Sequence, residues 1–191
     1  DVAPTKKAIS SVIITTDALE EAGIKEYTDI KIKFRVYDTN DWLSDDVALK
    51  SVHVYPLGEE KAVKYIREAK EGDIVIVDNE FVKAVITGYH NDILLGYGAK
   101  LYIENKTDGD AMFSVDESSV NGFMADPYFV HILAADTCAF TDISWYSSTL
   151  EEIGITEPQE EIMNIEFIFK AQDYSNLLGD KYCEEFVKID K

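Results

Sequence analysis

A capped helical turn followed by an alternating strand occurs twice in this chain of 191 residues. The first copy, DALEEAGIKEYTDIKIKFRVYD, runs from Asp17 to Asp38, and the second, STLEEIGITEPQEEIMNIEFIFKAQD, runs from Ser148 to Asp173. In both copies a polar residue opens the turn, a glycine ends it, and a strand with alternating apolar residues follows and ends at an aspartate. The chain is therefore expected to be built from a repeated unit.

The helical turn of each copy carries its own capping signal. A residue that favours the N-cap is followed three residues later by a glutamate, which is the spacing of a capping box. A glycine then stands where a left-handed residue would end the helix. The copies are separated by 150 − 19 = 131 residues between Leu19 and Leu150, and the caps and glycines keep this spacing. The residues predicted to build the two turns are Asp17, Glu20, Gly23, Ser148, Glu151 and Gly154.

The strand after each turn alternates between apolar and polar residues, which predicts one buried and one solvated face. Between Phe34 and Phe169 the spacing is 169 − 34 = 135 residues, so the second copy holds four extra residues, in the loop around Pro158. The polar residues Lys33 and Glu166 are expected in solvent. The residues predicted to be buried are Ile30, Ile32, Phe34 and Val36 in the first copy and Ile165, Phe167, Phe169 and Ala171 in the second.

Composition excludes several classes of partner. The chain has 18 Lys and Arg against 37 Asp and Glu, a net charge of -19, which argues against binding to nucleic acid or to anionic membrane surfaces. No apolar run approaches the roughly 18 residues of a membrane span. The chain opens at Asp1 without an initiator methionine or signal peptide, and we interpret it as a mature or truncated product. Cys138 and Cys183 could pair if their strands are neighbours, but small disulfide-dependent scaffolds usually carry more cysteines, which favours free thiols.

The rest of the chain indicates an all-β fold. Residues 9–16 are typical of a β-branched strand, and several short strands follow Gly72, separated by turn dipeptides such as Asn121-Gly122. This spacing favours an antiparallel sandwich. Residues 59–71 are the exception, because apolar residues at helical spacing predict a connecting helix there.

Residues 101–127, LYIENKTDGDAMFSVDESSVNGFMADP, followed by the LEEIGI turn and the strand ending at Asp173, resemble a repeat module of uncharacterised secreted proteins and lipoproteins of Gram-positive bacteria. The resemblance implies an immunoglobulin-like, or telokin-like, β-sandwich. It covers residues 60–191 as one complete module and residues 1–59 as the C-terminal half of a preceding one. An extracellular, membrane-tethered setting is also implied, with an anchor upstream of Asp1 and no catalytic role for the matching residues.

Candidate sites in the sequence are few. Asp38, Asn40 and Asp41 have a spacing that could supply oxygen ligands to calcium, with Trp42 beside them, although the loop lacks the glycine and the bidentate glutamate of an EF-hand and is more simply a polar turn. The residues Asn105 to Thr107 form a glycosylation sequon, which we interpret as a turn. The three histidines, His53, His90 and His131, are scattered and are interpreted as strand residues. Aromatic residues of the complete module could stack a sugar or hold a peptide, but a sandwich core would use the same residues, which are Tyr97, Tyr102, Phe123, Tyr128, Phe129 and Trp145.

The sequence thus predicts a non-enzymatic, cell-surface spacer, adhesion or interaction module without a cofactor, whose protein or glycan partner it does not identify. The alternative is a ligand-binding protein that holds a peptide, glycan or calcium at the loop ends of the sandwich. The first copy lacks a counterpart of residues 62–131, so its apolar face needs a cover. Strands of an upstream segment are the favoured cover, ahead of a strand-swapped dimer and of packing on residues 73–131 of the same chain.

Overall fold

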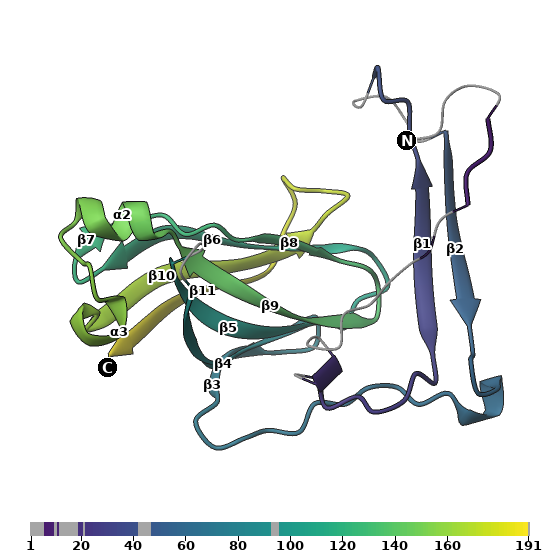
Figure 1. The fold of residues 1–191 in the computed structure, drawn as a ribbon, viewed down its shortest axis with the longest axis horizontal. Coiled ribbons are helices and arrows are strands. Elements are labelled where there is room, and N and C mark those ends of the chain that lie inside the picture. The colour runs from purple at the N-terminus through teal and green to yellow at the C-terminus, as the bar shows by residue number, and fades with distance from the viewer. Residues whose placement is uncertain are drawn as a thin grey trace. The chain divides into compact units, whose positions relative to one another are not determined.

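The computed structural model describes residues 6–9, 11, 19–20, 22–41, 47–92 and 96–190, and the chain divides into two compact units, residues 1–68 and 69–191 (Figure 1). The boundary falls inside the segment predicted as a connecting helix. Asp17, Trp42 and most of the strand predicted over residues 9–16 lie outside the described residues.

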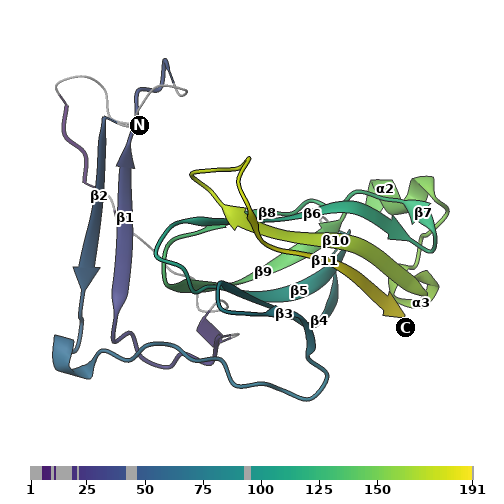
Figure 2. The same cartoon turned by 180° about the vertical axis from the view of Figure 1, so that it is seen from behind.

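The larger unit consists of two antiparallel sheets, which confirms the all-β prediction. One sheet has the order β3-β4-β5-β9, and the other has the order β11-β10-β6-β7, with β8 also paired to β6 (Figures 1 and 2). The strands of the first sheet are β3 (Ile74–Asp78), β4 (Val82–Asp92), β5 (Gly96–Asn105) and β9 (Thr137–Trp145). Those of the second are β6 (Ala111–Val120), β7 (Phe123–Met124), β8 (Val130–Leu133), β10 (Asn164–Asp173) and β11 (Lys181–Asp190).

The core of this unit lies between the two sheets, in a sandwich-like arrangement. Trp145 of β9 is fully buried and packs against Phe167 of β10, with ring centroids 6.4 Å apart. Its indole N–H donates to the Ser118 hydroxyl at 3.0 Å and to the Ala125 carbonyl at 3.1 Å, so the polar end of this large residue is satisfied inside the core.

In the described part of the smaller unit, β1 (Ile30–Val36) and β2 (Ala48–Val54) form an antiparallel hairpin, and a short 3-10 helix, η1 (Glu59–Lys61), follows. The helix predicted over residues 59–71 is wrong beyond this turn, because residues 62–70 have no regular secondary structure. Val63 and Ile66, on its predicted apolar stripe, are 68% and 80% exposed. An isolated helix of this length is marginal in water, and helical spacing alone does not supply the packing that would stabilise it.

The two helical turns end in the same way. Gly154 follows α2 (Ser147–Glu152) with φ +83°, and its N–H donates to the Glu151 carbonyl at 3.0 Å while the Ile155 N–H donates to the Leu150 carbonyl at 2.9 Å. These are the two bonds of a Schellman motif. In the first copy Gly23, with φ +67°, and the next residue donate to the corresponding carbonyls, those of Glu20 and Leu19, at 3.0 and 2.8 Å. The prediction of left-handed glycines at the ends of the turns is therefore confirmed.

The capping box predicted for the second turn is wrong. Tyr146 occupies the N-cap position of α2 and no side chain caps the helix, so Ser148 lies inside the first turn and Glu151 has no reciprocal partner there. The helix begins two residues before the position that the Ser–Glu spacing indicated. A later short helix, α3 (Pro158–Glu161), occupies the loop where the four extra residues were expected.

Substitutions in the α2 turn should distinguish the capping box, which the structure lacks, from the left-handed glycine, which it contains. Ser148→Ala is expected to change the free energy of unfolding by less than about 0.5 kcal/mol, because no cap bond is lost. Gly154→Ala should cost about 1–2 kcal/mol, because the left-handed backbone disfavours a side chain even though the new Cβ would meet no atom within 4 Å. Gly109→Ala is the control, since its Cβ also meets nothing and its backbone is not left-handed. Urea denaturation of the three variants measures these costs, and equal losses for the two glycines would contradict the explanation.

The tight turn predicted at Asn121 and Gly122 joins β6 to β7 and is confirmed. Both residues have positive φ, 52° and 80°, as a type I′ turn requires. The Asn121 amide group donates to the Glu161 carbonyl at 2.8 Å, and its oxygen accepts the Met163 N–H at 2.8 Å. This asparagine therefore fixes the loop between α3 and β10 as well as its own turn.

No disulfide joins the two cysteines. Cys138 lies on β9 and Cys183 on β11, in different sheets. Burial raises the pKa of the Cys183 thiol to about 11, so very little reactive thiolate exists at neutral pH.

In a Cys138→Ser variant, Cys183 is expected to react with a disulfide reagent only when urea unfolds the protein. Rapid labelling in native buffer would show that β11 opens locally.

Candidate interaction surface

The hairpin β1–β2 and the hairpin β10–β11 have the same register. Adding 135 to each residue number of the first set of pairs gives the second, so the spacing between Phe34 and Phe169 extends over both strands of each hairpin. The corresponding pairs are Ile30–Val54 and Ile165–Ile189, Ile32–Val52 and Phe167–Val187, Phe34–Lys50 and Phe169–Glu185, and Val36–Ala48 and Ala171–Cys183. The four pairs of each set share one face, because directly paired residues in an antiparallel ladder point the same way, and all their members except Lys50 and Glu185 are apolar.

The turn after the first strand is also shared. The Asp38 carboxylate accepts the backbone N–H of Asn40 at 2.8 Å, and the Asp173 carboxylate accepts that of Ser175 at 2.7 Å. The Asn40 side-chain amide donates to the same Asp38 oxygen at 3.1 Å. The residues weighed as calcium ligands thus form an Asx turn, with Asp41 closing it through its N–H to the Asp38 carbonyl at 3.2 Å. Across the described ranges no group of three or more His, Cys, Asp or Glu is placed to hold a metal ion.

Burial differs sharply between the two copies. In β10 the predicted apolar face is buried, and Phe169 and Ala171 are both 0% exposed. In β1 the prediction is wrong, because Phe34 is 47% and Val36 52% exposed while Ile30 and Ile32 are only half-buried. Alternation indicates which face is apolar, but a face is buried only when another layer covers it.

The second copy shows what covers such a face. Phe169 lies between Phe113 of β6 and Phe129, with ring centroids 6.2 Å from each, and Phe167 packs on Trp145 of the opposite sheet. The cover of β10 therefore comes from residues that precede it in the same unit. On the polar faces, Lys33 is exposed as predicted, whereas Glu166 is half-buried and lies 3.4 Å from the Lys188 ammonium group.

The polar face of β1 is basic in an otherwise acidic protein. The strands β1 and β2 carry no carboxylate, and Lys31, Lys33 and Arg35 lie on this face, whereas Lys50 pairs with Phe34 on the apolar face. The Arg35 guanidinium lies 5.5 Å from the centre of the Tyr37 ring. With a net charge of -19 over the whole chain, this is a local reversal of sign that the sequence analysis did not single out, although the alternation of β1 displays it.

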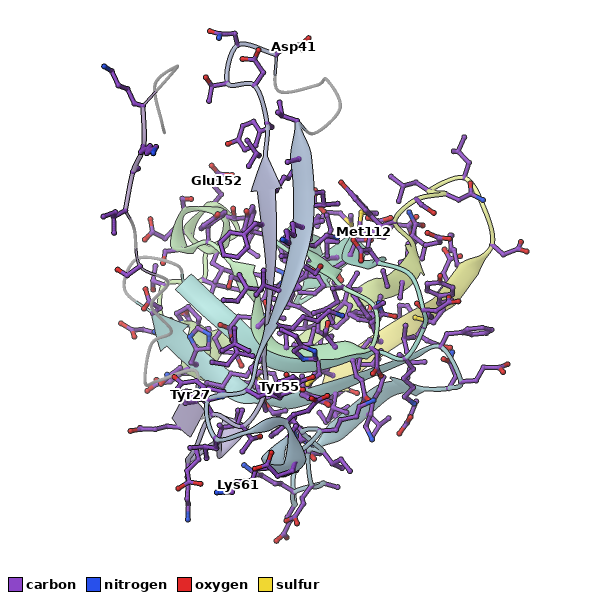
Figure 3. All side chains as sticks on the ribbon, turned by 90° about the vertical axis from the view of Figure 1, so that its right-hand side faces the viewer. Tyr27, Asp41, Tyr55, Lys61, Met112 and Glu152 are labelled. Carbon is purple, nitrogen blue, oxygen red and sulfur yellow. The ribbon has the colours of Figure 1, made fainter. Side chains whose placement is uncertain are left out.

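At the end of β2, Asp29, His53 and Tyr55 form a connected chain. The Asp29 carboxylate lies against Nε2 of His53, whose Nδ1 lies 2.9 Å from the Tyr55 hydroxyl. Figure 3 shows Tyr55 at one end of the hairpin and Asp41 at the other. Partial burial, Asp29 and Glu59 raise the pKa of the Tyr55 phenol, in that order, which makes its anion harder to form. These contacts join the end of β2 to Asp29, the residue that precedes β1.

The aromatic residues weighed as a sugar or peptide platform do not form one cluster. Phe123 and Tyr128 are exposed, and Tyr128 lies 6.2 Å from Tyr146, centroid to centroid. The other four are in the core: Tyr97, Tyr102, Phe129 and Trp145. The sequon residue Asn105 is likewise fully buried, which leaves no room for a glycan in the folded unit. Of the remaining histidines, His90 lies 3.2 Å from the Asp142 carboxylate, and burial lowers the pKa of His131.

Comparison of the chain with protein-family models, with curated proteins and with solved structures found no match. In the part of the chain that the structure describes, no helix has the length and apolar character needed to cross a membrane.

Proposed function

We propose that the chain is a non-enzymatic interaction module built from repeated immunoglobulin-like β-sandwich units and displayed at the surface of a bacterial cell, as a spacer or adhesion domain. The observation that carries this proposal is the constant spacing of 135 residues between the two hairpin registers. Duplication of a structural unit produces two hairpins that share the same register, the same Asx turn and the same helix ending.

The strand order of the larger unit supports the immunoglobulin-like part of the proposal. The chain leaves the first sheet after β5, returns to it for β9 and leaves it again for β10, so connections cross between the two sheets as in Greek-key sandwiches. The resemblance to modules of secreted proteins and lipoproteins supports the cell-surface setting. The acidic composition supports a solvated module rather than one that adheres to anionic lipid or nucleic acid.

The location can be tested on intact cells. An antiserum against the purified chain is expected to label unpermeabilised cells of the organism that makes the protein, while an antiserum against a ribosomal protein labels them only after permeabilisation. The proposal fails if both sera require permeabilisation.

Calcium binding at the Asp38 turn is the second candidate function. The hydrogen bonds of this loop favour a simple Asx turn over a calcium site. Millimolar calcium is expected to leave the melting temperature of the wild-type chain and of an Asp38→Asn variant unchanged, because the Asp38 oxygen already accepts two hydrogen bonds. A real site would stabilise the folded state by mass action. A rise in melting temperature that disappears in Asp38→Asn would revive the ligand-binding alternative.

A further inference from the structure

The strand β1 has one edge paired with β2 and a second edge on its opposite side. Among the described residues only β2 pairs with β1, whereas its counterpart β10 is paired on both edges, by β11 and by β6. Because β2 corresponds to β11 in register, the other edge of β1 corresponds to the edge of β10 that accepts β6. An unpaired strand edge presents backbone N–H and C=O groups that can accept a further strand.

The apolar face of β1 also indicates a strand of the β6 kind as its partner. Phe113, whose ring flanks that of Phe169, is a residue of β6, so in the larger unit one strand both pairs with β10 and shields the side of Phe169. Phe34 occupies the corresponding position of β1 and is 47% exposed. A strand of the β6 kind paired with β1, together with a second sheet packed on the apolar face, would supply hydrogen-bond partners to the edge of β1 and bury its apolar face.

Charge is complementary as well. In the larger unit Asp116 of β6 lies opposite Ile168 and forms an ion pair with Lys170. The residues of β1 at these two positions are Lys33 and Arg35, by the spacing of 135. The strand β6 carries two carboxylates and no cation, and β1 carries three cations and no carboxylate. A β6-like strand beside β1 would therefore place a carboxylate opposite Lys33 and close to Arg35.

We propose that the hairpin β1–β2 is the docking surface for the opening half of another repeat of the same kind, a layer that presents an acidic strand with the alternation of β6. This docking proposal rests on the proposed repeat architecture and identifies the partner of the hairpin. The occupant pairs with the edge of β1 and covers Phe34 and Val36. A second copy of this chain fits less well, because its β6 is already paired with its own β10, so each hairpin that docks would displace another.

The experiment compares hydrogen exchange in the full chain with exchange in a chain that carries an extra copy of residues 69–131 ahead of Asp1. This join follows the spacing of the two helical turns, 150 − 19 = 131. In the full chain alone the β1 and β2 amides are expected to exchange rapidly, because a lone two-stranded hairpin is marginally stable. In the extended chain they should exchange at least about 100-fold more slowly. The β10 amides serve as the internal control for folding in both proteins.

Two matched variants of the extended chain test how the added copy acts. Changing the Phe113 of the added copy to aspartate should abolish the protection of β1. Lys33→Glu should reduce it several-fold, and changing the Asp116 of the added copy to lysine should restore it, which a nonspecific apolar cover would not do. The proposal is overturned if β10 is protected while β1 exchanges equally fast with and without the added copy, or if the Phe113 variant protects β1 equally well.

Sedimentation of the unextended chain distinguishes the other occupant. If the wild type self-associates and its β1 amides become protected as concentration rises, the hairpin binds a second copy and the proposal is wrong. None of these readouts depends on where the protein is located, so failure here and failure of the cell-surface proposal can be told apart.

Discussion

Phe169→Ala is expected to lower the free energy of unfolding of the larger unit by about 3–5 kcal/mol, whereas Phe34→Ala, at the matched position of the first hairpin, should change stability by less than about 1 kcal/mol. Phe169 is 0% exposed and lies between two other phenylalanine rings, so its removal leaves a cavity in a closed core. Phe34 is 47% exposed and half of its surface already faces water. A phenylalanine at the same register position of the two hairpins is therefore expected to make very different contributions to the free energy of unfolding.

Urea denaturation followed by tryptophan fluorescence measures the first cost, because Trp145 lies in the core that Phe169 helps to fill. Exchange of the β1 amides reports the second, since a hairpin that melts separately does not move the main transition. Leu178→Ala, at a fully exposed apolar residue of the β10–β11 loop, is the control and should be neutral. A loss of several kcal/mol for Phe34→Ala would mean that β1 is covered in solution, and would contradict its exposure here.

This pair of positions also shows what sequence can and cannot predict. The period of two in β1 and β10 predicted the apolar faces of both strands, and in β10 that face is buried. In β1 the pattern is equally regular, yet burial depends on a second layer that lies far away in sequence or on another chain. A local pattern carries no information on that layer, which is why the prediction held for Ile165 and failed for Phe34.

The helical predictions failed for a related reason. Residues 59–71 have the spacing of an amphipathic helix, but spacing does not provide a surface on which the stripe packs, and only η1 forms. At α2, a serine followed by a glutamate fits a capping box, but the start of the helix depends on where β9 ends, three residues before the predicted cap. The glycines that end the turns were predictable because a left-handed residue is a local requirement.

Asn105 is a residue whose importance the sequence did not indicate, because NKTDG is typical of an exposed turn. The structure places it in the core, fully buried at the end of β5. Its amide group donates to the carbonyls of Gly109, Leu133 and Ala134 at 2.8, 3.2 and 3.1 Å, and its oxygen accepts the N–H and hydroxyl of Thr107 at 3.0 and 2.8 Å. One side chain thus joins the β5–β6 turn to the segment between β8 and β9.

Asn105→Asp is expected to cost about 3–5 kcal/mol at neutral pH, because a buried polar group left unsatisfied costs roughly 1–3 kcal/mol and three carbonyls lose their donor. The new carboxyl keeps the acceptor for Thr107 and nearly the same shape, so the loss isolates the donating amide. Burial beside three carbonyls should raise the pKa of this carboxyl above its unfolded value of roughly 3.9. The folded state then binds the proton more tightly, so the deficit should shrink as pH falls and grow as pH rises.

Urea denaturation of the wild type and of Asn105→Asp across the acidic range measures this dependence as the difference between the two proteins. Asn91→Asp, at an exposed residue of β4, is the matched control and should show no such trend. If the cost of Asn105→Asp is the same at every pH, the carboxyl is not held in an environment that opposes its charge. If the cost is below about 1 kcal/mol, the three carbonyls find other donors and the network does not hold the turn in place.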